Sequence, residues 1–341
     1  MTQEGSPRIL VIRPDRIGDV VLSLPTVDAL RHRWPKAYLA MMVQPYTQDV
    51  VLRNPSLDII IEDDLDGQHS GMVGFLKQVW RLRNYKFDTA LMLMPTMRHA
   101  WMLLLAGIPH RIGVGRTIYQ ALTFTRSISR NNYVPLRHES NYCLDLAGFL
   151  DARVPSGKPL IEVREEERQY ARSLLKHANG APIIGIHPGN QHNAPNWVPE
   201  RYGILADRLR EKYGANVVVT GDHNEKHLED RIISKLKPPI LSLIGELSVN
   251  ELILVINEMD LFISSSTGPM HLAGALGVPT VSIFCPLPAR SPQRWRPLGS
   301  QDKIVLPPNG ECPTCECGPL CDLSDISVEM VEKAVEERLK A

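Results

Sequence analysis

The sequence has no run of 18 apolar residues, and its first segment, 1–7, has no apolar core of the kind found in secretion signals. We therefore expect no membrane-spanning helix and a cytoplasmic protein. The 38 basic and 38 acidic side chains cancel, which argues against a nucleic-acid binder that works by overall charge. Six cysteines in 341 residues do not make the disulfide framework of a small secreted protein.

Two signatures of nucleotide-binding enzymes are missing as well. The chain has neither the G-x-G-x-x-G fingerprint of dinucleotide-binding domains nor the G-x-x-x-x-G-K-[ST] phosphate loop. Dinucleotide oxidoreductases and P-loop enzymes therefore lose their main support. A nucleotide site in this chain has to use other turns between strands and helices.

Apolar, β-branched runs alternate with amphipathic stretches along the chain. We expect strands at 8–13, 38–43, 57–61, 89–94 and 111–113, helices at 19–34, 71–84, 97–106 and 138–150, and an irregular loop at 119–136. A segment with two prolines, 151–159, fits an interdomain linker, and a second alternation runs from 165 to 284. The pattern predicts an α/β protein with two Rossmann-like, doubly wound domains.

The expected domains are 1–155 and 156–325, followed by a C-terminal helix, 326–341, that packs back on the N-terminal domain. Two doubly wound sheets leave a cleft between the carboxyl ends of their strands, where such folds bind ligands.

The segment Ser264 to His271 (S-S-S-T-G-P-M-H) joins an expected strand to an expected helix. Pro269 suits a first helical turn, and the serines and Thr267 are candidate N-caps. Unpaired backbone N–H groups and the positive end of the helix dipole then face one point, which suits a phosphate. His271 could add a donor to that anion. The alternative is an ordinary turn with a half-buried histidine.

A polar turn also follows the first expected strand. In Arg13-Pro14-Asp15-Arg16-Ile17-Gly18-Asp19, Gly18 permits close approach of the backbone to a ligand. Asp19 is either a partner of the helix dipole or a carboxylate directed into the cleft.

Two further turns follow strands of the second half, at His187-Pro188-Gly189-Asn190 and at Thr220-Gly221-Asp222-His223-Asn224-Glu225. Glu225 could accept hydrogen bonds from a ribose diol, or it could be a first-turn helix acid. Together with the turn at Ser264, they predict a nucleotide site in the second half.

The motifs R-x-D-R-I-G-D-V-V-L-S-L-P, H-P-G-N, N-W-x-P-E-R-Y, T-G-D-x-x-E and S-T-G-P-M-H-L-A-G-A-L-G-x-P occur in this order. The chain thereby resembles the ADP-heptose:lipopolysaccharide heptosyltransferases (glycosyltransferase family 9), from about Ile9 to the C-terminal helix. The resemblance implies a GT-B fold, with the acceptor bound mainly by the first domain and the nucleotide sugar by the second. It also implies inverting, metal-independent transfer of a heptose from ADP-heptose to a lipopolysaccharide inner-core acceptor, on the cytoplasmic face of the inner membrane.

The resemblance also implies roles for individual residues. Asp19 matches the general base for the acceptor hydroxyl, and Glu225 matches the glutamate on the donor ribose. Thr267 and Gly268 match contacts to the donor diphosphate, with His271 near those phosphates, and Leu247 falls where backbone contacts to adenine are made. We add to the donor site Ser266, His187 and Asn190. We assign to the acceptor site Gly18, Arg16, Arg111 and Arg116.

Two positions depart from the pattern of the family. Many relatives have a lysine at the place of Pro195 and an aspartate at the place of Ser266. These departures leave the identity of the donor open. A surface arginine such as Arg290, Arg294 or Arg296 could replace the lost cation. A sugar-nucleotide epimerase or hydrolase of the same fold, or a non-catalytic nucleotide-sugar-binding protein, is the alternative function.

Four cysteines lie close together, at Cys312, Cys315, Cys317 and Cys321. They could form a structural zinc site, although one residue between Cys315 and Cys317 is tight for a tetrahedral arrangement. Reduced thiols or a local disulfide are the alternatives. Cys143 and Cys285 lie in apolar segments and are expected in the core.

The segment Met97 to Leu105 mixes apolar and basic residues. It could rest on a membrane surface, or it could be a core helix with a basic end.

Overall fold

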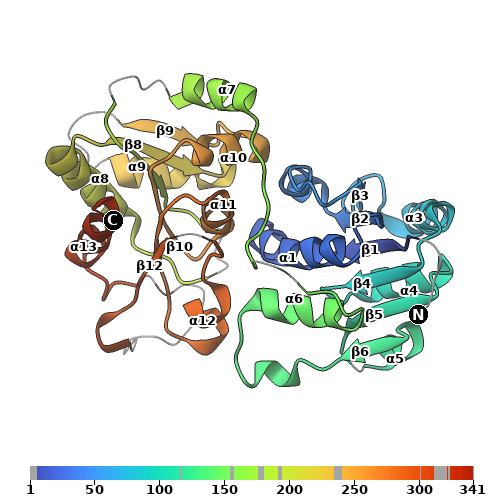
Figure 1. The fold of residues 1–341 in the computed structure, drawn as a ribbon. Helices are drawn as coiled ribbons and strands as arrows, with labels where there is room; N and C mark the ends of the chain where they lie inside the picture. Colours follow the sequence, from blue (N-terminus) through green and yellow to red (C-terminus); the bar gives the residue numbers. More distant parts are fainter. Residues whose placement is uncertain are drawn as a thin grey trace. The chain divides into compact units, whose positions relative to one another are not determined.

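The computed structural model describes residues 6–115, 117–153, 157–175, 180–190, 194–233, 240–299, 301–310, 321 and 323–340. The chain divides into two compact units, Met1–Ile161 and Glu162–Ala341. Each unit is an α/β structure built on a parallel sheet (Figure 1). In the described residues no helix has both the length and the apolarity that crossing a bilayer requires.

In the described part of the first unit, six parallel strands lie in the order β3-β2-β1-β4-β5-β6. β1 is an interior strand of this sheet. Its residues Ile9 to Ile12 are fully buried, as expected of a strand that helices cover on both faces. The strands are β1 Arg8–Ile12, β2 Tyr38–Val43, β3 Ile59–Glu62, β4 Thr89–Met92, β5 His110–Val114 and β6 Arg126–Ile128. The helices are α1 Ile17–Arg33, α2 Gln48–Val51, α3 Gly71–Tyr85, α4 Met97–Leu105, α5 Ile118–Thr123 and α6 Glu139–Gly148.

The second unit repeats this arrangement, with strands in the order β12-β11-β10-β7-β8-β9. The strands are β7 Ile183–His187, β8 Asn216–Gly221, β9 Leu241–Ile244, β10 Leu261–Ser265, β11 Thr280–Ile283 and β12 Asp302–Val305. The helices are α7 Glu165–Leu175, α8 Pro199–Tyr213, α9 Lys226–Ile233, α10 Val249–Asn257, α11 Gly268–Leu276, α12 Pro292–Trp295 and α13 Val328–Leu339. In both sheets the strand order reverses beside the first strand of the unit, which is where doubly wound folds bind ligands.

The expected pair of doubly wound parallel sheets is confirmed, but one local prediction is wrong. The segment 119–136 is not irregular throughout, because it contains most of α5, the edge strand β6 and a short 3-10 helix, Asn131–Tyr133. α5 begins with a capping box in which the Thr117 N–H donates to Gln120 Oε1 at 2.8 Å. A helix of six residues and a strand of three are too short to show a hydrophobic period.

The C-terminal helix α13 packs within the second unit, against α8, β11 and β12. Its residues Val331, Ala334 and Val335 are buried in the core of that unit. The expected return of this helix to the first domain stays a prediction.

Candidate active site

The candidate residues of the first unit are grouped around Arg13, which follows β1 at the carboxyl edge of the first sheet. Its side chain is only 2% exposed. Nε lies 3.0 Å from Oδ2 of Asp15, and Nη2 lies 2.6 Å from Oδ1 of Asp19 and 3.4 Å from Oε1 of Glu139. Nη1 lies 3.5 Å from the sulfur of Cys143. Burial opposes the charge, but the surrounding thiol and carboxylates raise the pKa of Arg13, so the cation persists.

Asp19 has the most accessible of the three carboxylates on Arg13. It lies in the first turn of α1, where the helix dipole favours a negative charge. Its side chain is 22% exposed, against 15% for Asp15 and 2% for Glu139. Gly18, directly before it, is buried. Asp19 therefore combines a fixed orientation with access from solvent, which are the two requirements of a general base.

Asp15 has a raised pKa in this cluster. Burial, together with the negative charges of Asp19 and Glu139, raises the pKa of Asp15 to about 6, although Arg13 and Arg130 oppose the shift. Its protonation therefore changes the charge around Arg13 within an accessible pH range.

Three members of the cluster come from a segment that sequence reasoning did not connect with Asp19. Glu139 and Cys143 lie on α6, and Arg130 Nη1 lies 3.3 Å from Oε1 of Glu139. Arg130 also donates from Nη2 to the carbonyl of Leu93, at the end of β4. In the sequence, the charged Arg13 directly after an apolar strand could have indicated this cluster. The packing of α6 on α1 could not be predicted from the sequence.

The expected acceptor arginines differ in what they contact. Arg16 is the exposed residue at the N-cap of α1. Arg111 donates from Nη1 to the carbonyls of Ile108 and Pro109 and from Nε to the carbonyl of Thr123. These bonds join the ends of α4 and α5, and the role of Arg111 toward an acceptor stays a prediction. Arg116 lies outside the described residues.

The candidate residues of the second unit lie at the carboxyl ends of β7 and β8. His187, the last residue of β7, is buried, and its Nδ1 is 3.0 Å from Oγ1 of Thr220 on β8. Its Nε2 is 3.9 Å from Oε2 of Glu225. Burial lowers the pKa of His187, although Glu225 opposes this, and the imidazole is therefore mainly neutral near pH 7. The structure thus brings together two of the predicted donor-site residues.

Glu225 has a structural role in addition to the role expected for it. It completes a capping box, in which its Oε2 accepts a hydrogen bond from the Asp222 N–H at 2.8 Å. A Cβ at Gly189 would lie 2.0 Å from the carboxylate carbon of Glu225. A side chain there would have to displace the Glu225 carboxylate, so the turn after β7 lies directly against this group.

Hydrogen bonds also hold two loops next to these residues. Asn190 is buried and donates from Nδ2 to the Ala194 carbonyl at 2.7 Å. Gly245, in the left-handed region at φ 72°, donates its N–H to the Gly221 carbonyl at 2.9 Å. This bond sets the half-buried Leu247 just beyond the end of β9, on the edge that carries Glu225.

The turn before α11 differs from expectation in one respect. Ser264 and Ser265 are not caps but belong to β10, and the Ser265 hydroxyl bonds to the Trp197 N–H and the Tyr202 hydroxyl. Thr267 is the N-cap, and its side chain makes no capping hydrogen bond. Pro269 lies in the first turn, as expected.

The residues around this helix start differ in exposure. Ser266, Thr267 and Gly268 are half-buried, and His271 is 4% exposed. The start of α11 is therefore a helix end without a side-chain cap, and an anion can bind to its backbone N–H groups.

The cysteine cluster cannot be placed, because Cys312, Cys315 and Cys317 lie outside the described residues. Cys143 and Cys285 are buried, which confirms the expectation for them. Across the described segments, no group of three or more His, Cys, Asp or Glu side chains has the arrangement of a metal site. One D-x-D sequence, Asp64-Leu65-Asp66, occurs after β3, and there Asp64 accepts a hydrogen bond from the Gln68 N–H at 3.0 Å.

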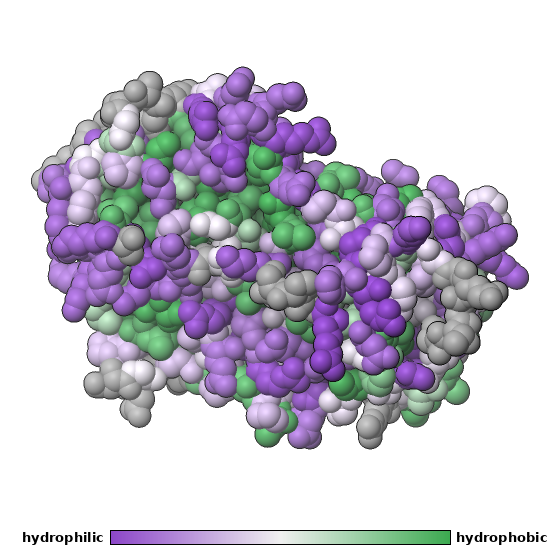
Figure 2. Space-filling view, in the orientation of Figure 1, coloured by the Kyte–Doolittle hydropathy of each residue, from purple (hydrophilic) through white to green (hydrophobic). Residues whose placement is uncertain are grey.

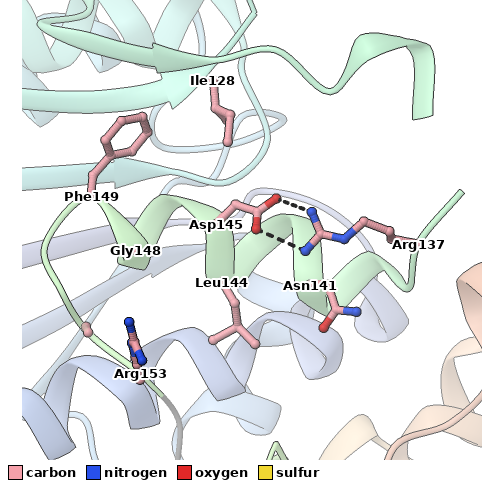
Figure 3. A pocket seen from close by; sticks show the side chains of 9 residues that line it. Ile128, Arg137, Asn141, Leu144, Asp145, Gly148, Phe149 and Arg153 are labelled. Carbon is pink, nitrogen blue, oxygen red and sulfur yellow. Dashed lines mark hydrogen bonds and ion pairs between the residues drawn. The ribbon is translucent and has the colours of Figure 1, made fainter. Parts of the chain in front are cut away.

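A cavity of about 580 Å³ lies along the outer side of α6 (Figure 3). Arg137 and Asp145, both in its lining, form a two-point ion pair at 2.8 and 3.0 Å. Its lining consists of Ile128, Arg137, Asn141, Leu144, Asp145, Gly148, Phe149, Ala152 and Arg153. None of these lining residues belongs to the expected site.

Comparison with solved structures places the fold in a known class. The chain superposes on Escherichia coli ADP-heptose lps heptosyltransferase II with a TM-score of 0.80 and 23% identity over 98% of both chains. A glycosyl transferase family 9 structure from Veillonella parvula gives a TM-score of 0.83 and 22% identity, again over 98% of both chains. The fold is therefore GT-B. Residues 76–319 match the model of glycosyltransferase family 9 (heptosyltransferase), so the chain belongs to this family and is a glycosyltransferase.

Among curated proteins, lipopolysaccharide heptosyltransferase 2 of Escherichia coli K12 is 25% identical over 312 residues, which cover 87% of each protein.

Proposed function

We propose that this enzyme transfers a heptose from ADP-heptose to an inner-core acceptor of lipopolysaccharide. The family and the names of its similar members support the heptose and the acceptor. The observation that carries the proposal is the carboxylate of Asp19, which Arg13 orients and which is the most exposed of the three carboxylates on that guanidinium. In this proposal the first unit binds the acceptor and the second unit binds the nucleotide sugar, in the cytoplasm.

The proposed reaction is a single displacement at the anomeric carbon. The acceptor oxygen forms a bond to this carbon as the bond to the diphosphate breaks, and Asp19 takes the proton of the acceptor hydroxyl. Attack from the side opposite the leaving group inverts the anomeric configuration. Arg16, exposed beside Asp19, is proposed to contact an anionic group of the acceptor.

The leaving diphosphate gains charge in this step and needs positive partners. We assign the backbone N–H groups at Thr267 and Gly268, where the helix dipole favours an anion, and the side chain of His271. Glu225 and His187 are proposed to contact the ribose side, with Leu247 next to the base. No metal ion is required in this assignment.

Arg290 is the proposed substitute for the lysine that Pro195 replaces. It ends a 3-10 helix, Pro288–Arg290, that follows β11, and β11 pairs with β10, the strand that leads to Ser266. Within the described residues, its buried Nη1 has no hydrogen-bond partner. The two neighbouring arginines are engaged, since Arg294 lies over the Trp295 ring and Arg296 lies 3.5 Å from Asp302.

The test uses the purified full chain with a panel of nucleotide sugars and a deacylated, water-soluble inner-core acceptor. We expect ADP-heptose to give the transferred product by mass spectrometry, with the anomeric configuration inverted by NMR and with turnover unaffected by EDTA. A preference for another nucleotide sugar would overturn the donor assignment. Hydrolysis or epimerisation of the donor without transfer would overturn the function. Metal analysis of the same sample tests the prediction of zinc at the cysteine cluster.

A further inference from the structure

Three adjacent helices of the first unit, α3, α4 and α5, carry large apolar side chains on their outer surface. α4 packs between α3 and α5 (Figure 1). On α3 the exposed fractions are 71% for Met72, 82% for Val73, 54% for Leu76 and 69% for Trp80. Met97 on α4 is 60% exposed, and Ile118 on α5 is 83% exposed. In this view, Figure 2 shows a small green area at the lower right, near α5.

This apolar surface is separate from the face that α3 uses for the core. Leu82 is buried in the core of the first unit, and Phe75 and Val79 pack against it. Met72, Leu76 and Trp80 follow one another at intervals of four residues and therefore form a second stripe, on the other side of the helix. A helix that is apolar on both sides, when only one side has a partner in its own fold, marks an interaction surface.

The charges on these helices have one sign, although the whole chain is neutral. α3 contains Lys77, Arg81 and Arg83 and no acidic residue, and α4 and α5 contain no acidic residue either. Lys77 and Arg83 are exposed beside the apolar stripe. An apolar stripe on a helix whose own charged residues are all cations is complementary to a lipid surface with anionic headgroups, and a tryptophan is favoured at such an interface.

We propose that the surface formed by α3, α4 and α5 docks on a membrane that contains anionic lipids. The helices lie in the plane of the interface, with the stripe of Met72, Leu76 and Trp80 among the acyl chain ends and Lys77 and Arg83 at the phosphates. This inference deepens the proposed function. It rests on that function only for the reason to bind a membrane, because an acceptor anchored by acyl chains lies at a membrane.

The test is co-sedimentation of the full chain with vesicles rich in phosphatidylglycerol and with vesicles of phosphatidylcholine alone. We expect binding to the anionic vesicles that weakens as salt is added. The double variants Leu76→Ser/Trp80→Ser and Lys77→Gln/Arg83→Gln should each lower the partition coefficient about tenfold or more. Ile204→Ser, at a 37% exposed apolar residue on α8, is the matched control and should bind as the unaltered protein does.

Equal binding of the surface variants and the unaltered protein would overturn the proposal. The proposal would also be overturned if this surface binds a second copy of the chain. In that case the α3 variants abolish a concentration-dependent dimer and leave vesicle binding unchanged. Transfer to the deacylated acceptor separates this proposal from the proposed function. The α3 variants should keep that activity, and a failure of transfer in every protein would overturn the function without affecting vesicle binding.

Discussion

Nη2 of Arg13 lies 2.6 Å from Oδ1 of Asp19, and both groups lie at the carboxyl edge of the first sheet. Arg13 is buried, whereas Asp19 is partly exposed, so the pair fixes one carboxylate oxygen and leaves the side chain open to a ligand. A buried guanidinium that contacts several carboxylates costs free energy unless its partners remain ionised. Asp15, Asp19 and Glu139 therefore act as a set, and the charge of one affects the others.

Replacing Asp15 tests this coupling through pH. The pKa of Asp15 is raised to about 6, so it gains a proton as the pH falls through about 6. Arg13 then loses one anionic partner, and the charge around the Arg13–Asp19 pair changes. We expect kcat/KM to fall below about pH 6, and we expect Asp15→Asn to remove this inflection. The pH–rate profile of Asp66→Asn, at an exposed aspartate, is the control. An inflection that survives in Asp15→Asn contradicts the coupling.

Replacing Glu225 tests the donor half. Gln at this position can still accept the Asp222 N–H, so the capping box and the fold should be kept. The loss of charge should weaken donor binding by roughly 10- to 100-fold if the carboxylate accepts hydrogen bonds from ribose hydroxyls. Calorimetric titration with ADP-heptose measures it, and Glu246→Gln, at an exposed glutamate, is the control. An unchanged Kd would leave Glu225 with its capping role alone.

The polar turns could be predicted from the sequence because their function depends on local order: a strand, a turn with glycine, and a helix start. Asp19, His187 and Glu225 each lie at such a turn, and their functional roles stay predictions. Glu139 and Arg130 could not be predicted in this way, because Glu139 meets Arg13 only through the packing of α6 on α1, and Arg130 contacts Glu139 and the carbonyl of Leu93 after β4. The serines at the end of β10 were assigned to a cap because sequence alone does not tell the last strand residue from the first helix residue. The exposed stripe on α3 was missed because an apolar period does not reveal which side is covered.

Asp63 gives a prediction about stability. It is fully buried after β3, with its Oδ2 2.9 Å from Nε2 of His99 and 3.3 Å from Nε of Arg98. Burial opposes ionisation, but the hydrogen bonds from His99 and Arg98 hold the pKa of Asp63 at about 2. A lowered pKa stabilises the fold at pH values above that of the unfolded carboxyl, about 4, and this contribution is lost as the pH falls toward 2.

Asp63→Asn should therefore reduce the free energy of unfolding by about 2–3 kcal/mol at pH 7. Urea denaturation at several pH values measures the difference, and we expect it to shrink from pH 5 to pH 3. Asp66→Asn should unfold as the unaltered protein does. A deficit that stays constant down to pH 3 would show that the charge of Asp63 does not contribute in this way.

The assignment of Asp19 as general base is tested most directly by Asp19→Asn, with turnover and donor affinity measured on the same preparation. Turnover with ADP-heptose and the deacylated acceptor should fall by about 100- to 10,000-fold, because the acceptor hydroxyl loses its base. The Kd of ADP-heptose should stay nearly unchanged, since the proposed donor contacts lie on the second unit. Retained turnover, or a loss of turnover that a weakened donor affinity accounts for, would contradict the assignment.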